Sequence, residues 1–172
     1  MLGYAAFVLA DAWIFQKRAN LELERRHEQP AAHSAGSPAE RPAGLIGRIE
    51  IPRIGLAAVI AEGIDSTTLR RAAGHIPDTA LPGQPGNVGI AGHRDSFFRP
   101  LRNIRKDDLI TLTTALGEYR YRVLSARVVG PTDVSVLYPT GDSILTLVTC
   151  YPFYFVGAAP NRFIVRAELA DH

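Results

Sequence analysis

Short strand-like runs, separated by turn signals, dominate the chain from residue 45 onward. β-branched and aliphatic residues fill these runs, and Gly, Pro, Asn or Asp residues interrupt them. Such a succession of strands with only minor helices predicts an all-β fold, either a β-barrel or a β-sandwich, and not a doubly wound sheet. The expected strands cover residues 46–51, 56–61, 87–91, 109–113, 119–129, 143–149 and 163–169.

Two short helical segments are expected between these strands. Asp65 can cap a helix over Ser66 to Ala73, because its carboxylate can accept the unpaired N–H groups of a first turn. A second short helix or turn is expected over residues 97–103.

The N-terminal part of the chain has a different pattern. Leu2 to Phe15 is an apolar run interrupted by Asp11, shorter than the ~20 residues that a spanning helix needs. No basic stretch precedes it and no small-residue cleavage pattern follows, which argues against a cleaved signal peptide. We expect the C-terminal part of a membrane anchor. The alternative is a partner-binding or buried amphipathic helix.

Basic residues are interspersed with glutamates from Gln16 to Gln29, and large apolar residues are few, which indicates a solvated helical stalk. Residues 1–29 are thus expected to form an anchor remnant and stalk. The Pro-rich residues 30–44 are expected to form a flexible linker, and residues 45–172 the folded domain.

Composition excludes several kinds of function. The net charge of the 172-residue chain is only +2, and no basic stripe interleaved with aromatics suggests nucleic acid as a partner. A single cysteine rules out an intramolecular disulfide, and no Cys/His cluster has zinc spacing. We predict no metal and no cofactor.

Cys150, the one cysteine, ends the apolar run over residues 143–149 and is followed by Pro152. A lone cysteine on an apolar strand is usually a small core residue. Here the strand end next to a proline favours a position at the rim of the sheet. His93 also ends a strand, after Gly92, and Arg162 opens the last strand. We therefore expect these three strand ends to meet in one site.

These three residue types suit acyl transfer. A thiolate is a strong nucleophile, and a nearby imidazolium or guanidinium helps to hold the ionised form. Histidine can donate a proton to a leaving amine and accept one from an incoming nucleophile. The rigid guanidinium fork can bind an oxyanion or fix a peptide carbonyl. Cys150, His93 and Arg162 together predict chemistry through a thioester.

Other residues are weaker candidates. Thr149 and Tyr151 flank the cysteine and are expected to bind substrate, although Thr149 is equally explained by β-propensity. His75, also after a glycine, is a competing base and more simply a loop or groove-wall residue. Asp95 could orient His93 or belong to a turn, and Arg94 is most simply a surface charge.

Three segments resemble the sortases, cysteine transpeptidases that attach proteins to bacterial cell walls or pili. TLVTC matches the TLxTC signature, LPGQPGNVGIAGHRDSFFRPL resembles the histidine segment, and NRFIVRAEL resembles the final strand with its arginine. The similarity covers residues 45–169, and its details are most like class D. It implies an eight-stranded sortase β-barrel preceded by an N-terminal helix. Cys150 would be the nucleophile, His93 the general acid/base and Arg162 the clamp for substrate or transition state.

The resemblance also implies a reaction and partners. An LPxTG-like C-terminal sorting signal would be cleaved between Thr and Gly, and the acyl group transferred to an amine of a peptidoglycan precursor or a pilin. The enzyme would be held at the cell membrane with its catalytic domain outside the cytoplasm. Two alternatives remain: another class of thiol enzyme, and an inactive or binding-only membrane-anchored barrel in which Cys150 is a core residue.

Overall fold

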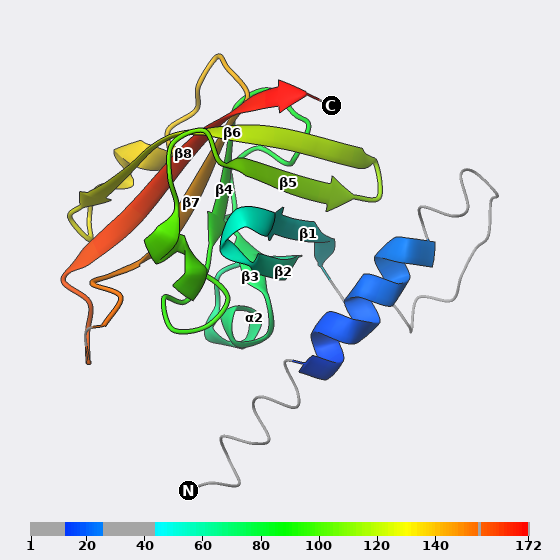
Figure 1. Cartoon of the computed structure of the whole chain (residues 1–172), viewed down its shortest axis with the longest axis horizontal. Coiled ribbons are helices and arrows are strands. Elements are labelled where there is room, and N and C mark those ends of the chain that lie inside the picture. Colours follow the sequence, from blue (N-terminus) through cyan, green and yellow to red (C-terminus); the bar gives the residue numbers. More distant parts are fainter. Residues whose placement is uncertain (1–12, 26–43, 155, 172) are drawn as a thin grey trace, which may run out of the picture.

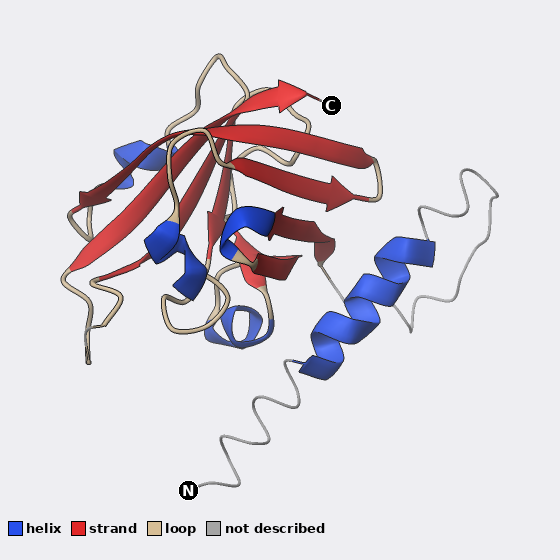
Figure 2. Cartoon of the chain, in the orientation of Figure 1, coloured by secondary structure: helices blue, strands red, loops and turns tan. Residues whose placement is uncertain are grey.

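The computed structural model describes residues 13–25, 44–154 and 156–171. Within them, eight strands form a closed barrel in the order β1-β2-β3-β4-β7-β8-β6-β5 (Figures 1 and 2). The predicted eight-stranded barrel is therefore confirmed, and the sandwich alternative is set aside. The strands are β1 (Leu45–Ile51), β2 (Leu56–Glu62), β3 (Ala73–His75), β4 (Asn87–Ala91), β5 (Leu109–Thr114), β6 (Gly117–Val129), β7 (Ile144–Tyr151) and β8 (Asn161–Asp171).

Short helical segments connect the strands (Figure 2). They are η2 (Pro52–Ile54), α2 (Ser66–Arg71), η3 (Arg99–Asn103) and η4 (Val134–Leu137). Asp65 caps α2 as predicted, since its Oδ1 accepts the N–H groups of Thr67 and Thr68 at 2.9 and 3.1 Å. The helix ends at Arg71, earlier than expected, because the chain enters β3 at Ala73.

Strand β3 is the element that sequence patterning missed. It has three residues, AGH, too few and too small to give a β signal. It pairs parallel with β2 and antiparallel with β4, and so completes the barrel wall between them. A Cβ atom on Gly74 would lie 2.2 Å from the carbonyl oxygen of Gly63. The glycine is required for this close approach of two backbones.

Side-chain alternation separates the inner and outer faces of β7. Leu145 and Leu147 are fully buried in the barrel core. In the pairing register they face Val88 and Ile90 of β4, which belong to the same core cluster. Because successive side chains in a strand point to opposite faces, the even-numbered residues of β7 project from the outer face.

The N-terminal helix over residues 13–25 lies on the β1 and β2 side of the barrel (Figure 1). Ala19 and Leu23 are buried, and Ala19 packs with Val59 and Ala61 of β2. One face of this helix therefore packs on the barrel, whereas Lys17 and Arg18 on its other side are exposed. The central residue of this contact is a small alanine, which adds little hydrophobic signal to the sequence but lets the helix approach the barrel closely.

Gln16 fastens this helix to the barrel. Its Oε1 accepts the backbone N–H of Val59 at 2.8 Å, and its Nε2 donates to the carbonyl of Arg71 at 2.7 Å. Pairing between β2 and β3 begins only at Ile60. The Gln16 amide thus satisfies a part of β2 that β3 is too short to cover.

The anchor and linker predictions fall largely on residues 1–12 and 26–43, outside the described residues. In the part of the chain that is described, no helix has the length and apolar character needed to span a membrane. The anchor, the linker and the domain boundaries stay predictions.

Candidate active site

Cys150 lies near the end of β7, and its side chain is half-buried. As an even-numbered residue of this strand it projects from the outer face of the barrel, not into the core. None of the described residues forms a hydrogen bond with its thiol. The position combines a strand backbone that is paired on both sides with a side chain that is only half-buried.

Arg162 lies directly opposite Cys150 in the antiparallel register of β7 and β8. Directly opposed residues have Cβ atoms roughly 4.5–5.5 Å apart and project from the same face. The guanidinium Nη1 donates to the carbonyls of Ala159 and Asn161 at 3.2 and 2.9 Å. Within the described part of the chain, Nε and Nη2 have no acceptor. These contacts orient the fork and leave donors for a ligand.

His93 follows strand β4, which pairs with β7 on the side opposite β8, and it lies level with Cys150 along the strand direction. Strand β4 runs parallel to β7 with Ala91 opposite Val148, and Gly92 N–H donates to the Val148 carbonyl at 3.1 Å. His93 follows Ala91 by two positions, as Cys150 follows Val148. The N–H of Phe98 donates to the His93 carbonyl at 3.2 Å and holds this backbone in place. No described residue forms a hydrogen bond with the imidazole ring.

Gly92 allows this arrangement. A Cβ atom on it would lie 2.7 Å from the ring of Phe98, a fully buried core residue. The ring therefore packs directly on the backbone that leads into His93. Thr149 supports the same backbone, since its hydroxyl donates to the Gly92 carbonyl at 2.7 Å.

Thr149 has a structural contact of its own, and its expected contact with substrate stays a prediction. Its side chain is buried and its hydroxyl is used by Gly92, so the hydroxyl is not available to a substrate. Tyr151, on the same inner face, stacks on Phe163 at a centroid distance of 6.2 Å and meets Phe153 edge-on at 6.0 Å. The rings of Tyr151, Phe153 and Phe163 thus pack together next to the paired ends of β7 and β8. A contact of half-buried Tyr151 with substrate stays a prediction.

His75 does not belong to the rim. It is 3% exposed, its Nδ1 lies 2.9 Å from Glu62 Oε2, and its Nε2 lies 3.0 Å from the carbonyl of Ala80. Thr79 Oγ1 is a further neighbour of Nε2 at 3.1 Å. Because both ring nitrogens are engaged, His75 links β2, β3 and the segment that leads to β4. Its expected contact with substrate stays a prediction.

Arg94, expected to be a surface charge, makes two hydrogen bonds to the loop that follows Cys150. Its Nη1 donates to the Pro152 carbonyl at 3.1 Å and its Nη2 to the Gly157 carbonyl at 2.8 Å. The residue after the candidate base thus holds the loop that follows the candidate nucleophile. No sequence pattern signals such contacts to distant carbonyls. Asp95, the proposed orienting carboxylate, is exposed and makes no hydrogen bond to His93 among the described residues.

Three adjacent strand ends therefore bring Cys150, His93 and Arg162 to one rim, at the end of the barrel where a loop joins β7 to β8 (Figure 1). This arrangement can place a nucleophile between a proton carrier and an oxyanion donor. Over residues 13–25, 44–154 and 156–171, no group of three His, Cys, Asp or Glu side chains is placed to hold a metal ion.

Comparisons with known proteins agree with this geometry. A family model described as the sortase domain matches residues 49–170. Sortase D of Bacillus subtilis is 31% identical over 178 residues, covering 96% of this chain and 90% of the relative. Sortase A of Listeria monocytogenes is 31% identical over 62% of this chain and 49% of the relative.

Solved structures point the same way. A Clostridium perfringens Sortase D5 transpeptidase superimposes with a TM-score of 0.74 and 27% identity, covering 94% of this chain and 99% of that one. A lid mutant of sortase A from Corynebacterium diphtheriae superimposes with a TM-score of 0.71 and 27% identity, covering 90% of this chain and 94% of that one. The resemblance predicted from three sequence segments, with class D among the similar relatives, is confirmed: the chain belongs to the sortase family of cysteine transpeptidases.

Proposed function

We propose that Cys150, His93 and Arg162 carry out the transpeptidation. The observation that supports this most is the strand register, which sets Cys150 opposite Arg162 and brings the end of β4 to the same level. A core role for Cys150 does not suit a half-buried side chain that projects from the outer face of the barrel. The inactive or binding-only alternative is accordingly not favoured.

In the first half of the reaction, the Cys150 thiolate attacks the carbonyl carbon of Thr in an LPxTG-like sorting signal. The oxygen of the tetrahedral intermediate gains negative charge, and the Nε and Nη2 donors of Arg162 are suited to stabilise it. The C–N bond then breaks, His93 gives its proton to the leaving amino group of Gly, and a thioester forms on Cys150.

In the second half, an amine attacks the thioester carbonyl and gives its proton to His93. The C–S bond breaks, the thiolate of Cys150 is restored, and the acyl group is left in a new amide bond. The acceptor we propose is an amine of a peptidoglycan precursor or a pilin lysine. The histidine thus alternates between acid and base, and the two half-reactions leave its protonation unchanged.

The proposed location follows from the substrates. Sorting signals and cell-wall amines are met outside the cytoplasm, so we propose a catalytic domain on the outer side of the membrane. The apolar run from Leu2 is the proposed attachment. The docked helix over residues 13–25 would then hold the barrel close to that attachment.

The test is mass spectrometry of the whole protein mixed with sorting-signal peptides. We expect a mass increase equal to the acyl fragment, located on the peptide that contains Cys150, with release of a glycine-led fragment. Cys150→Ala should give neither, while its unfolding midpoint stays close to that of the parent because a rim thiol contributes little packing.

A scrambled peptide of the same composition serves as the matched control. Absence of any adduct across a panel of LPxTG-like peptides, in protein whose thiol reacts freely with a small alkylating reagent, would overturn the proposed substrate class. A thiol that reacts only after denaturation would overturn the role of Cys150 itself.

A further inference from the structure

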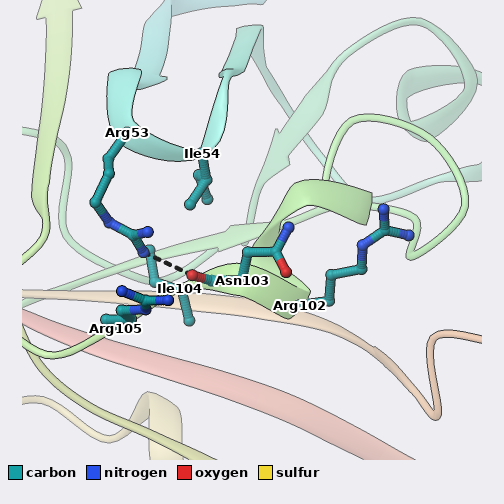
Figure 3. A pocket seen from close by; sticks show the side chains of 6 residues that line it. All are labelled: Arg53, Ile54, Arg102, Asn103, Ile104 and Arg105. Atoms are coloured by element: carbon teal, nitrogen blue, oxygen red, sulfur yellow. Dashed lines mark hydrogen bonds between the residues drawn. The ribbon is translucent and has the colours of Figure 1, made fainter.

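A cavity of about 440 Å³ opens between η2 and η3, away from the three proposed catalytic residues. Six residues line it: Arg53, Ile54, Arg102, Asn103, Ile104 and Arg105. Figure 3 shows Arg53 and Arg105 on one side and Arg102 on the other, with Asn103 and Ile104 between them. Three of the six lining residues are arginines, and none is acidic.

Arg53 forms a fixed wall of this cavity. Its guanidinium pairs with the buried carboxylate of Asp108 through two hydrogen bonds, and its Nη2 also donates to the Asn103 carbonyl at 2.6 Å (Figure 3). Asp108 Oδ2 also accepts the backbone N–H of Arg105 at 2.8 Å. The hydrogen bond from Arg53 holds the pKa of Asp108 below its usual range. The charge of Arg53 is therefore already balanced, and its contacts order the cavity.

Arg102 and Arg105 supply the unbalanced charge. The segment over residues 99–106 holds Arg99, Arg102, Arg105 and Lys106, all exposed. Because a 3₁₀-helix has three residues per turn, Arg99 and Arg102 lie on one side of η3. Asp107, the nearest exposed acid in sequence, does not line the cavity. The wall thus carries a local excess of positive charge.

One residue that lines the cavity, Arg102, also contacts the loop that follows Cys150. The Arg102 guanidinium carbon lies 5.5 Å from the ring centroid of Tyr154, in the loop that follows Cys150. Strand β4 and η3 are joined by the segment that holds His93, which Phe98 anchors against Gly92.

The neighbouring ring also defines what Arg102 can bind. A guanidinium held against an aromatic ring by a cation–π contact keeps its N–H donors in its own plane, where a carboxylate or phosphate can accept two of them. The fixed residues of an LPxTG-like signal carry no anionic side chain. An anion at Arg102, beside the loop that follows Cys150, is therefore better supplied by the second substrate.

We propose that this arginine-lined cavity binds an oxyanion, a carboxylate or a phosphate, carried by the amine acceptor. The inference rests on the proposed transpeptidase function, and it assigns a charge requirement to the second substrate. Arg102 and Arg105 bind the anion, whereas Arg53 and Asp108 hold the cavity in shape.

The test compares matched acceptors in resolving the Cys150 thioester. Triglycine is paired with triglycine amide to measure a carboxylate, and Gly-Gly-phosphoserine amide with Gly-Gly-Ser amide to measure a phosphate. We expect kcat/KM for one anionic acceptor to exceed that of its neutral partner by about tenfold, the size of a charge-assisted bidentate contact. The pair with the larger ratio identifies the anion.

Variants show whether the cavity is responsible. In Arg102→Gln/Arg105→Gln the ratio should fall to about one. Arg102→Lys/Arg105→Lys keeps the charge without the planar fork and should keep only part of the ratio. Arg18→Gln removes an exposed arginine from the N-terminal helix and should leave the ratio unchanged. Ratios that are equal in the parent and the double Gln variant would overturn the proposal.

A binding measurement separates this proposal from the reaction itself. Titration of the isotope-labelled protein with inorganic phosphate should shift the backbone amide signals of residues 102–105 saturably, and not in the double Gln variant. A lack of saturable shifts would overturn the anion site even if the thioester forms. Failure of the proposed function would instead appear as the absence of an acyl adduct on Cys150, whether or not phosphate shifts the amide signals.

Discussion

The rim formed by β4, β7 and β8 differs from the patch formed by β2 and β3 in how its polar side chains are used. Each region contains a Gly-His pair, Gly92-His93 at the rim and Gly74-His75 in the patch, on neighbouring parts of the barrel. His75 has partners on both ring nitrogens. His93 has none among the described residues, and Cys150 beside it has none either.

This difference separates structural from catalytic residues of the same type. A buried polar group without a partner is costly, so a fold satisfies such groups wherever it can. Partly exposed groups that face one another with unused donors are available to a ligand. The comparison predicts that changes at the rim reduce turnover, whereas changes in the patch reduce stability.

The largest effect is expected at His93. His93→Ala removes the proposed acid and base of both half-reactions, so kcat/KM for acyl transfer should fall about 10²–10⁴-fold. Peptide cleavage under saturating acceptor gives the rate, and chemical denaturation gives the stability, which should stay close to that of the parent. Activity comparable to the parent would move the proton-transfer role elsewhere.

A smaller loss is expected for Arg162→Lys. The lysine keeps the positive charge but offers a single point of contact in place of two parallel donors. We expect kcat to fall about 100-fold, in line with loss of an oxyanion donor, with KM for the peptide little changed. Full turnover would contradict the clamp role. A large rise in KM alone would make Arg162 a residue that binds the ground state.

Much of the rim was visible in the sequence. The β-branched run that ends at Cys150 and the Gly92-His93 strand end located two of its residues by pattern. Arg162 was placed by its position at the start of the last strand. The alternation of a strand carries this information, because it fixes which residues share a face and where the face ends.

The contacts that support the rim were not visible. The hydrogen bonds of Arg94 join carbonyls 58 and 63 residues away, and no local pattern records such a distance. The burial of His75 depends on β3, whose three residues give no strand signal. Ala19 gives little signal in a hydrophobic pattern, yet it is the centre of the helix contact.

The patch gives the third prediction, a change in stability. His75→Ala removes hydrogen bonds to Glu62, Ala80 and Thr79 and should lower the free energy of unfolding by about 2 kcal/mol. Urea denaturation measures it. Activity per folded molecule at a permissive temperature should stay within about twofold of the parent, since the rim is unchanged. A loss of turnover without a loss of stability would return His75 to the substrate groove.

Arg94 is a structural residue that should nevertheless affect turnover, because it holds the loop that follows Cys150. Arg94→Ala should release the carbonyls of Pro152 and Gly157 and lower kcat/KM about tenfold, the size of one or two hydrogen bonds to a charged group. Arg94→Lys can reach one carbonyl and should recover part of the loss. If Arg94→Lys and Arg94→Ala both had the activity of the parent, the loop after Cys150 would not need the hydrogen bonds of Arg94.

The smallest effect is expected at Gln16, whose amide oxygen and nitrogen are both used by the barrel. Gln16→Ala leaves the N–H of fully buried Val59 without its side-chain partner, so the free energy of unfolding should fall by about 1 kcal/mol. Gln16→Glu is the informative comparison: its carboxylate can still accept from Val59 but cannot donate to the Arg71 carbonyl. Hydrogen exchange of the Val59 amide should be faster in the Ala variant and remain slow in the Glu variant. Equal exchange in all three proteins would mean that the helix over residues 13–25 leaves the barrel in solution, so that the Val59 amide is not protected by Gln16.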